Sequence, residues 1–396
     1  MSRHGPTFDV IVVGGRVAGA STAMLLARAG ARVLVLDRAG YGTDSLSTHG
    51  LMRGGVLQLA RWGLLDRVVA AGTPAVRSTT FRVAGERPLE IQIAARAGVD
   101  ALYAPRRHLL DRLLVDAAAA AGAEVRHGTR VTRLLRDARG RVTGVGMVDS
   151  TGVETSATAT YVVGADGIRS QVADEVGARV LEQRQHGSAV RYAYVRGLDV
   201  PDFVWGYGNG AAAGLIPTNH GEHCVFVATS PQRMRTLRLG RSADEVLDLL
   251  VGLAAPDLRE PLAAARRVSR HHGWAGTPGF RRQPWGSGWA LVGDAGYYKD
   301  PIGSHGITDA LRDAELLARA LLGALGGRDE SAALADYHRT RDAVSQELLD
   351  VTDAIASYTW DTTEVQLLLR GLSAAMSEEV RLLESLPEVG AAAAVS

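Results

Sequence analysis

The sequence predicts an α/β protein with a Rossmann-like dinucleotide-binding domain, an interleaved antiparallel β-sheet domain and a C-terminal helical layer. Three observations support this fold class. The chain opens with a strand, a glycine-rich turn and a helix. Segments with strand-like alternation interrupt the α/β pattern twice, and helical patterns fill most of the chain after residue 330.

The opening stretch has the order of a βαβ unit. Residues 9–13 are a run of apolar, mostly β-branched residues, typical of a buried strand. The turn Gly14-Gly15-Arg16-Val17-Ala18-Gly19 follows, and residues 20–29 read as a helix that ends at Gly30. The second strand, residues 32–36, ends at Asp37. This order indicates a nucleotide site, because such a turn directs free N–H groups and a helix dipole toward a pyrophosphate.

Asp37 and Arg16 refine this interpretation. An acid at the end of the second strand can accept hydrogen bonds from both ribose hydroxyls, which favours FAD or NAD over NADP. Arg16 stands where the second glycine of the motif is usual, so its guanidinium is expected either to stay outside the turn or to reach a phosphate or the flavin edge. The alternative is a tight turn in an ordinary α/β protein.

Composition excludes several classes of function. The formal net charge of +1 gives no electrostatic case for nucleic acid or an anionic membrane. Lys299 is the only lysine, which the codon bias of a GC-rich genome explains. Cys224 is alone, so intramolecular disulfides are excluded, and His271-His272 lacks a third ligand at a suitable spacing, so we expect no metal site. No apolar run reaches membrane-spanning length and residues 1–7 do not read as a signal peptide, so we expect a cytoplasmic protein, either a monomer or a homodimer.

Later segments alternate between the two kinds of pattern. Period-two alternation predicts antiparallel strands in a first group (78–93) and in a second group (188–196, 214–219, 223–228 and 266–274). The α/β pattern predicts helices over 51–72, 108–121, 171–176 and 307–325, and strands over 124–126, 131–135, 142–148, 158–163 and 289–292. Residues 243–253 and 331–384 read as helical, and 390–396 as a frayed tail.

These boundaries predict an interleaved domain organisation. Three segments would form the cofactor domain, 1–72, 102–178 and 289–330. Two would form a substrate domain, 73–101 and 179–288, and 331–396 would be a C-terminal helical region.

Two further glycine–acid motifs follow the first, Gly164-Ala165-Asp166-Gly167 and Gly293-Asp294-Ala295 with Pro301 and Gly306. In this order and at these spacings the three resemble the single-component FAD-dependent monooxygenases of the para-hydroxybenzoate hydroxylase fold, which are related to geranylgeranyl reductases. The resemblance spans residues 8–320. It implies FAD as the cofactor and NAD(P)H as a transient reductant, which fits the absence of a second glycine-rich βαβ unit.

The resemblance also implies the residues that hold FAD. In the family the first motif binds the pyrophosphate, the strand-end acid binds the ribose, an arginine ahead of Leu-x-x-x-Leu approaches the phosphates, and the third motif meets the ribityl chain and the ring. Arg107, rather than Arg106, has the required spacing to Leu110 and Leu114. The expected cofactor residues are Gly14, Gly15, Arg16, Val17, Ala18, Gly19, Asp37, Arg38, Ser45, Thr48, Arg107, Val131, Asp166, Gly167, Gly293, Asp294, Pro301, Gly306 and Ile307.

Two of these residues have simpler interpretations. Asp166 can cap a short helix beginning near Ile168, and Arg107 can be a solvated charge at a helix start. The usual closing arginine of the second motif is replaced by Ala173, and the third motif carries Ser304 and Thr308 where the family has glycine and asparagine. The helix beginning near Gly306 would direct its N–H groups and dipole at the reduced flavin.

Residues on the substrate side are less well marked. His49, Pro301 and His305 are the candidate catalytic residues, because they sit in loops expected to border the flavin ring. Candidates for the pocket wall are Arg53, Tyr192, Tyr194, Trp205 and His223. Each of the aromatic and histidine residues can equally be structural.

The function that the resemblance implies is NAD(P)H- and O₂-dependent monooxygenation. The enzyme would hydroxylate or epoxidise a small aromatic or polyketide-like molecule through a flavin C4a-hydroperoxide. Alternatives are a reductase of the geranylgeranyl reductase type and a flavin-binding protein without turnover. Halogenation is not expected, because the Trp-x-Trp-x-Ile-Pro stretch of flavin halogenases is missing and the only lysine, Lys299, lies in the third motif.

Overall fold

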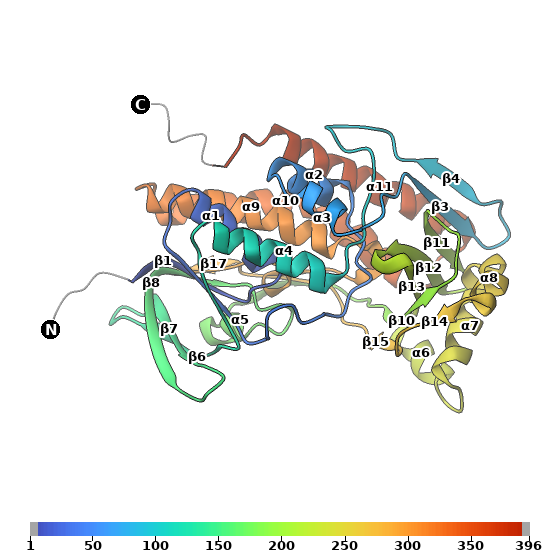
Figure 1. Ribbon diagram of the computed structural model, residues 1–396, viewed down its shortest axis with the longest axis horizontal. Coiled ribbons are helices and arrows are strands. Elements are labelled where there is room, and N and C mark those ends of the chain that lie inside the picture. Colours follow the sequence, from blue (N-terminus) through green and yellow to red (C-terminus); the bar gives the residue numbers. More distant parts are fainter. Residues whose placement is uncertain (1–6, 390–396) are drawn as a thin grey trace.

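A computed structural model describes residues 7–389 and confirms the predicted mixed α/β fold class (Figure 1). Two large β-sheets lie side by side along the length of the molecule. Helices cover one face of the first sheet and both faces of the second, and the longest helices run across the junction between them. The tail predicted for residues 390–396 lies outside the described residues.

The first sheet is built around strands that are parallel to one another. Its order is β17 (Trp285–Gly286), β18 (Trp289–Leu291), β8 (Glu154–Gly164), β1 (Phe8–Val13), β2 (Val33–Asp37) and β5 (Glu124–His127). All neighbours from β18 to β5 pair in parallel, and β17 is antiparallel. β1 and β2 are buried on both faces, as their continuous apolar sequences predict.

Helices and a hairpin cover the two faces of this sheet. On one face lie α1 (Val17–Arg28), α4 (Arg107–Ala120) and α9 (Gly306–Leu325), whose apolar sides share one core with the sheet. On the other face lie β6 (Arg130–Arg136), β7 (Val142–Val148) and the short helix α5 (Gln171–Val176). Figure 1 shows the helices above the sheet and the hairpin below it.

The second sheet is mostly antiparallel. Its order is β14 (Arg266–Arg267), β10 (Ala189–Arg196), β13 (Glu222–Thr229), β12 (Ala211–Thr218), β11 (Phe203–Gly208), β3 (Ser78–Val83) and β4 (Leu89–Gln92), with β15 (His272–Trp274) also paired to β10. β3 and β4 therefore join strands that follow more than 90 residues later, which explains why two separate stretches of the sequence alternate with period two.

Both faces of the second sheet are covered by helices. The outer face packs against α7 (Ala243–Ala254), near α6 (Pro231–Leu237) and α8 (Arg259–Ala264). The inner face packs against α10 (Glu330–Ala356) and α11 (Thr362–Ser385). The remaining elements are α2 (Arg53–Arg61), α3 (Leu65–Ala70), a small sheet of β9 (Val180–Gln183), β16 (Phe280–Arg282) and β19 (Tyr297–Tyr298), and the 3₁₀ turns η1 (Asn219–Gly221), η2 (Pro256–Leu258), η3 (Gly293–Ala295) and η4 (Pro301–Gly303).

Two predicted elements differ from the structure. The single strand expected over 266–274 is two short strands, because the Ser269 hydroxyl accepts the hydrogen bond of the Tyr194 N–H at 2.9 Å and so replaces a rung of the ladder. The helix expected over 51–72 breaks into α2 and α3 at Gly63, whose φ of +71° no continuing helix adopts. β9 and β11 were not predicted.

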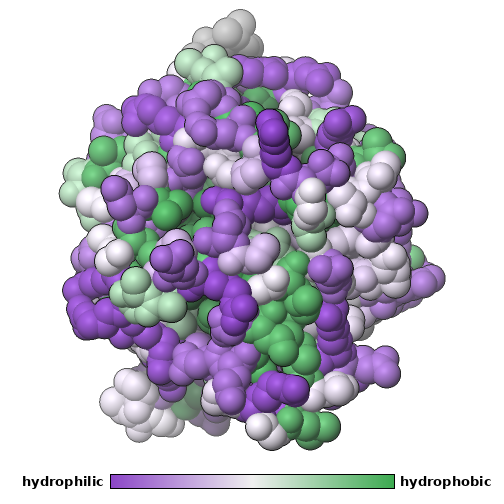
Figure 2. All heavy atoms as spheres, turned by 90° about the vertical axis from the view of Figure 1, so that its right-hand side faces the viewer, coloured by the Kyte–Doolittle hydropathy of each residue, from purple (hydrophilic) through white to green (hydrophobic). Residues whose placement is uncertain are grey.

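The end of the molecule that carries β4 and α8 has a mostly hydrophilic surface with a narrow hydrophobic strip (Figure 2). Large exposed apolar side chains of the elements found there include Leu89 and Ile91 of the edge strand β4. Within residues 7–389, no helix is both long and apolar enough to cross a membrane.

Candidate functional site

The turn between β1 and α1 is shaped to hold an anion. Gly14 adopts a φ of +106°, and α1 begins at Val17 with the extended residue Arg16 before it. In the described chain no side chain caps this helix, and its first turn holds no acid. The N–H groups of the first turn are therefore left for a ligand, with the positive end of the helix dipole behind them.

The glycines of this turn are required by close backbone contacts. A Cβ at Gly14 would lie 2.4 Å from the carbonyl oxygen of Ala165. A Cβ at Gly19 would lie 1.8 Å from the carbonyl oxygen of Gly14 and 3.0 Å from the Ala165 Cβ. A Cβ at Gly293 would meet Ala18 at 2.9 Å. The first, second and third motifs thus touch one another, although they are separated by more than 100 residues each.

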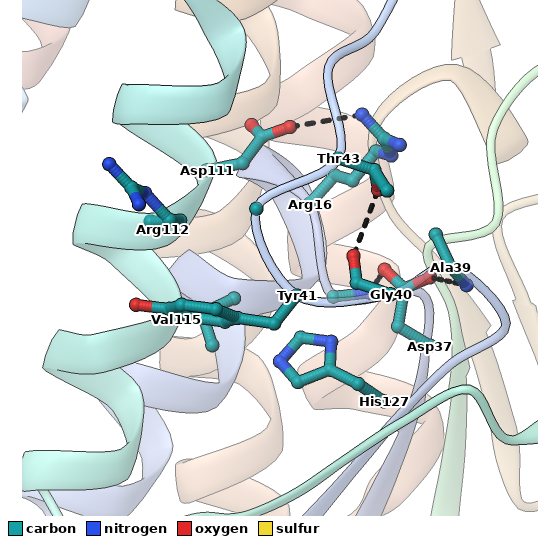
Figure 3. Close-up of a pocket in the computed structure, with 12 residues that line it drawn as sticks. Arg16, Asp37, Ala39, Gly40, Tyr41, Thr43, Asp111, Arg112, Val115 and His127 are labelled. Carbon is teal, nitrogen blue, oxygen red and sulfur yellow. Dashed lines mark hydrogen bonds and ion pairs between the residues drawn. The ribbon is translucent and has the colours of Figure 1, made fainter.

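Asp37 anchors the turn and borders a shallow pocket (Figure 3). Its carboxylate accepts hydrogen bonds from the Gly15 N–H at 2.9 Å and from the Ala39 N–H at 2.8 Å. The pocket continues along the loop after β2, where Tyr41 lies between α4 and His127. Each oxygen of Asp37 still has a free lone pair, so the carboxylate can bind ligand hydroxyls in this pocket.

The Arg16 side chain stays outside the turn, which is the first of the two positions expected from the sequence. Its guanidinium binds the Asp111 carboxylate of α4 at 3.2 Å (Figure 3). Arg107 binds the same carboxylate at 3.0 and 3.1 Å. Arg106 points the other way. It binds Asp44 at 2.8 Å and Glu222 at 2.9 Å, and its guanidinium lies 3.8 Å from the centre of the Tyr194 ring.

The second motif caps α5. Asp166 accepts the Ser170 hydroxyl at 2.5 Å and the Val172 N–H at 3.1 Å, and Ser170 in turn accepts the Ala173 N–H. Gly167 has a φ of +82°. Ser170 is thus the N-cap residue of α5, which begins at Gln171 rather than near Ile168, and Asp166 supports the cap by binding the Ser170 hydroxyl and the Val172 N–H. The residue before it, Ala165, touches the first motif.

A cavity of about 270 Å³ lies beside this loop. Arg169, Arg282, Trp274 and Phe280 are among its lining residues. The Arg282 guanidinium lies 4.5 Å from the centre of the Phe280 ring and donates to the Ala295 carbonyl at 3.0 Å. The cavity thus lies next to the second motif, and the hydrogen bond of Arg282 connects its wall to the third motif. Its lining includes two arginines and two aromatic side chains.

The third motif places Asp294 near two cations. The Asp294 side chain reaches solvent, but the surrounding protein partly desolvates its carboxyl group and raises its pKa to about 6. The nearby cations Arg107 and Lys299 oppose this rise. This makes Arg107 more than a solvated charge at a helix start. Farther along, Asp300 fixes the Pro301 turn by accepting the Ile302 N–H at 2.9 Å and the Ser188 hydroxyl at 2.6 Å.

Helix α9 begins at Gly306, directly after this turn. In the described part of the chain no side chain caps its first N–H groups. Ser304 adopts a φ of +47°, and a Cβ at Gly50 would lie 3.3 Å from the Ser304 Cβ, so the loop holding His49 lies against the start of α9. The uncapped helix end can stabilise a negative charge that lies close to its N–H groups.

His305 points into the protein interior. Its Nε2 lies 2.6 Å from a Glu379 oxygen of α11, and the side chain is buried. The other Glu379 oxygen accepts from Arg312 at 2.7 Å, and Asp309 binds both Arg312 and Lys299. A metal ion could by distance alone be held by His305, Asp309 and Glu379. However, the carboxylate oxygens that such an ion would need are bound by Lys299 and Arg312. This network was not predicted from the sequence. The only sequence feature that points to it is the spacing of the ionisable residues at 305, 309 and 312, which puts them on one side of a largely apolar helix.

The inner face of the second sheet collects most of the predicted substrate residues. Tyr192, Tyr194 and Trp205 are buried there in one cluster. His49, with a φ of +67°, is fully buried and its Nε2 hydrogen bonds to the Tyr194 hydroxyl. Burial lowers the pKa of His49 to about 3, with Arg106 adding to the effect, so its imidazole is neutral. Within residues 7–389 its Nδ1 has no hydrogen-bond partner.

Several predicted residues lie elsewhere. His223 is on β13 beside Val225, whose side chain packs on the outer face, and its ring binds the Val200 carbonyl at 2.8 Å. Arg53 donates to the carbonyls of Val99 and Ala94. Val131 is buried between the first sheet and the β6–β7 hairpin. Arg38 is exposed, and Ser45 and Thr48 are half-buried, all in the segment that follows β2.

Comparisons with known proteins find similar flavoproteins by sequence and by structure. A family model described as FAD binding domain matches residues 7–352. Aklavinone 12-hydroxylase DnrF of Streptomyces peucetius is 26% identical over 88% of this chain and 74% of its own length. Digeranylgeranylglycerophospholipid reductase 2 of Methanopyrus kandleri is 28% identical over 84% of this chain and 82% of its own length. The crystal structure of Pseudomonas aeruginosa PqsL in complex with 2-aminobenzoylacetate superposes with a TM-score of 0.81 at 24% identity and covers 92% of this chain and 99% of that one.

Proposed function

This chain belongs to the FAD binding domain family, and from that premise we propose that it is an FAD-dependent monooxygenase that uses NAD(P)H and O₂ to hydroxylate or epoxidise a small aromatic or polyketide-like molecule. The hydroxylase relative from Streptomyces peucetius and the aromatic ligand in the similar PqsL structure support the substrate class. The same proposal has the enzyme act in the cytoplasm, as a monomer or a homodimer.

One observation carries the proposal, namely that the three motifs meet at the uncapped start of α1. The glycines at 14, 19 and 293 leave no space for a Cβ, so the backbone of all three segments closes around a single cradle. FAD fits this cradle, because its pyrophosphate needs free N–H groups and its ribose needs an acid at the end of β2.

Each side chain of the cradle has a defined task in this proposal. Asp37 binds the ribose hydroxyls, and the N–H groups of α1 with Arg107 bind the phosphates. Asp294 orients the ribityl chain, and the first turn of α9 stabilises negative charge on the ring. FAD supplies the redox chemistry and oxygen activation when bound. The cavity lined by Arg169 and Arg282 offers cations to the phosphates of the reductant.

The substrate side is the inner face of the second sheet, opposite the loop that holds His49. Its aromatic side chains suit a planar aromatic substrate. The neutral His49 imidazole can accept a hydrogen bond from a substrate hydroxyl at Nδ1 when its Nε2–H donates to the Tyr194 hydroxyl. His49 is our candidate catalytic residue, with the task of orienting the substrate, whereas His305 is engaged in the interior network.

A second candidate is reduction of a carbon–carbon double bond, which the similarity to the Methanopyrus kandleri reductase favours. The two candidates differ in their products. Monooxygenation adds one oxygen atom from O₂, whereas reduction adds hydrogen and consumes no O₂.

The testing experiment begins with the visible spectrum of the purified protein, before and after NADPH or NADH is added without oxygen. Bleaching of a flavin band supports the redox role. Substrate candidates are then screened for linked NAD(P)H consumption and O₂ uptake, with isotope-labelled O₂ to trace the added atom. Turnover without O₂ would contradict monooxygenation. If the protein shows no bound flavin after FAD has been added and the excess removed, the cofactor assignment is contradicted.

The Asp37→Ala variant is expected to bind FAD about 10- to 150-fold more weakly, because about 1.5–3 kcal/mol of charge-assisted hydrogen bonding is lost. The measurement is titration of the apoprotein with FAD, followed by flavin fluorescence. Asp248→Ala is a matched control, since it removes an exposed acid that pairs with Arg259 away from the cradle. Equal FAD affinity in Asp37→Ala and the parent chain would refute the role of Asp37.

A further inference from the structure

A cluster of six ionisable side chains lies behind the loop that joins the third motif to α9. It comprises Lys299, His305, Asp309, Arg312, Asp313 and Glu379, and we name it the buried charge cluster. The most exposed member, Lys299, is only 6% exposed. Lys299 donates to Asp309, and Arg312 binds Asp309, Asp313 and Glu379 at 2.7 to 2.9 Å. A Cβ at Gly54 would lie 3.0 Å from the Glu379 carboxylate, so even α2 is fitted to this cluster.

We propose that Lys299 is a proton-exchanging group of the flavin site, which takes up a proton when the flavin is reduced and releases it when the flavin is reoxidised. This inference rests on the proposed function, because it needs the flavin in the cradle described above. It assigns a task to a residue within the third motif that is not one of the expected cofactor-binding residues.

The choice of lysine at position 299 is the first argument. The chain has 44 lysine and arginine residues, and Lys299 is the only lysine among them. Buried cations elsewhere, such as Arg281 and Arg341, are arginine. Arginine does not lose its proton in proteins, whereas lysine does so readily when it is buried. The single lysine therefore stands at a buried position next to the cofactor cradle, where it can gain and lose a proton as the charge of the flavin changes.

The charge balance of the cluster is the second argument. Asp309, Asp313 and Glu379 contribute three negative charges, and Arg312 contributes one permanent positive charge. Lys299 and His305 can each adjust the balance by gaining or losing a proton. Burial is the main cause that lowers the pKa of Lys299 to about 7, with Arg312 acting in the same direction and Glu379, Asp313 and Asp294 opposing it. Burial also lowers the pKa of His305, which Glu379 opposes.

Proximity to the cradle is the third argument. Lys299 lies between Asp294 and Pro301 in the chain, and it donates a hydrogen bond to Asp309 in the first turn of α9. Lys299 and Asp294 also shift the pKa of one another. A negative charge arriving at the start of α9 would act on Lys299 as Asp294 does and would favour its charged form.

The proton balance of the step follows. Two electrons and one proton convert the oxidised ring to its reduced form with one negative charge. A second proton, taken from solvent, converts the Lys299 amine to an ammonium group. Reoxidation returns both protons and removes two electrons, so Lys299 keeps the site electrically balanced.

A single lysine makes this proposal directly measurable. The holoprotein is produced with lysine labelled by ¹³C at Cε and ¹⁵N at Nζ, using an affinity tag without lysine, and gives one lysine resonance. This resonance is titrated with pH in the oxidised protein and after photochemical reduction without NAD(P)H, substrate or oxygen. We expect a midpoint near pH 7 in the oxidised state and a midpoint at least about one pH unit higher after reduction. A resonance that stays in the ammonium form up to about pH 10 in both states, or a midpoint that reduction leaves unchanged, overturns the proposal.

Two variants separate proton exchange from a structural role. Lys299→Arg keeps the cation but cannot release a proton, so proton uptake on reduction at about pH 8 should fall from about 1.4 or more protons per flavin to about one. Equal uptake in Lys299→Arg and the parent chain overturns the proposal. Arg319→Lys is the matched control, because it places a second lysine against the buried Glu315 farther along α9, and its resonance should not respond to reduction. A protein that binds no flavin contradicts the proposed function itself, whereas a flavin-loaded protein whose Lys299 does not respond contradicts only this inference.

Discussion

The Gly19→Ala variant is expected to lack bound flavin and to lose about 3 kcal/mol of stability. The new Cβ would lie 1.8 Å from the Gly14 carbonyl oxygen and 3.0 Å from the Ala165 Cβ. Both neighbours belong to backbone or to a side chain that cannot rotate away, so α1 must shift along its axis and move its N–H groups. The measurements are the flavin content of the purified protein and the free energy of unfolding in urea.

Gly323→Ala is a suitable control for this variant. It makes the same chemical change in α9, where the nearest atom to the new Cβ, in the Arg328 side chain, is 3.6 Å away. Alanine has a higher helix propensity than glycine, so stability should be unchanged or higher by up to about 1 kcal/mol. A Gly19→Ala protein with the flavin content of the parent chain would show that the turn does not hold the cofactor.

The Arg312→Met variant is expected to lose about 3–5 kcal/mol of stability near neutral pH. It leaves Asp309, Asp313 and Glu379 buried without their permanent cation, while methionine occupies a similar space. The measurement is urea-induced unfolding at about pH 7 and about pH 5, with Arg339→Met as a control, since Arg339 forms an exposed pair with Asp336 and should cost less than about 1 kcal/mol.

The pH dependence of this variant has a defined sign. In the parent chain, His305 and Arg312 hold the pKa of Glu379 at about 2 against its burial, so the stability that its charge contributes is fully present above the usual pKa of 4.5 and is lost only as the pH falls toward 2. Without Arg312, burial raises the pKa of the cluster acids above their unfolded values, and the folded state binds more protons than the unfolded state. The Arg312→Met protein should therefore gain stability between pH 7 and pH 5. A loss below about 1 kcal/mol, or a fall in stability over that range, would contradict the importance of the network.

The sequence was most informative where function depends on the backbone. Gly14, Gly293 and Asp37 could be placed because each sits at the end of an apolar strand, and parallel strands present these ends at one edge of a sheet. Gly19 could be placed by its spacing from Gly14 in the glycine motif. The spacing of Arg107 to Leu110 and Leu114 favoured it over Arg106, and in the structure Arg106 turns to Asp44 and Glu222. Local spacing carries this information because one helix or one turn positions each of these residues.

Contacts between distant side chains could not be predicted in the same way. Glu379 meets His305 across 74 positions, and no periodicity links α11 to the start of α9. His223 was expected in the substrate pocket, but its place in the alternation of β13 puts it beside Val225 on the outer face. A register shift of one residue exchanges the faces of a strand, and the sequence of this stretch, apolar on both faces, does not reveal which face is inward.

The strand order of the first sheet also bears on how the enzyme is made in the cell. β1, one of the earliest segments to be synthesised, takes its place between β2 and β8, and β8 must then pair with β18. The contact between Ala18 and Gly293 therefore waits until almost three quarters of the chain has left the ribosome. During that interval the nascent chain exposes an unpaired strand edge without help from the cofactor, so early segments depend on chaperones or on their own helices for protection. FAD can stabilise the protein only at the end of synthesis, and its supply should influence the yield of folded enzyme more than the rate at which the first domain begins to fold.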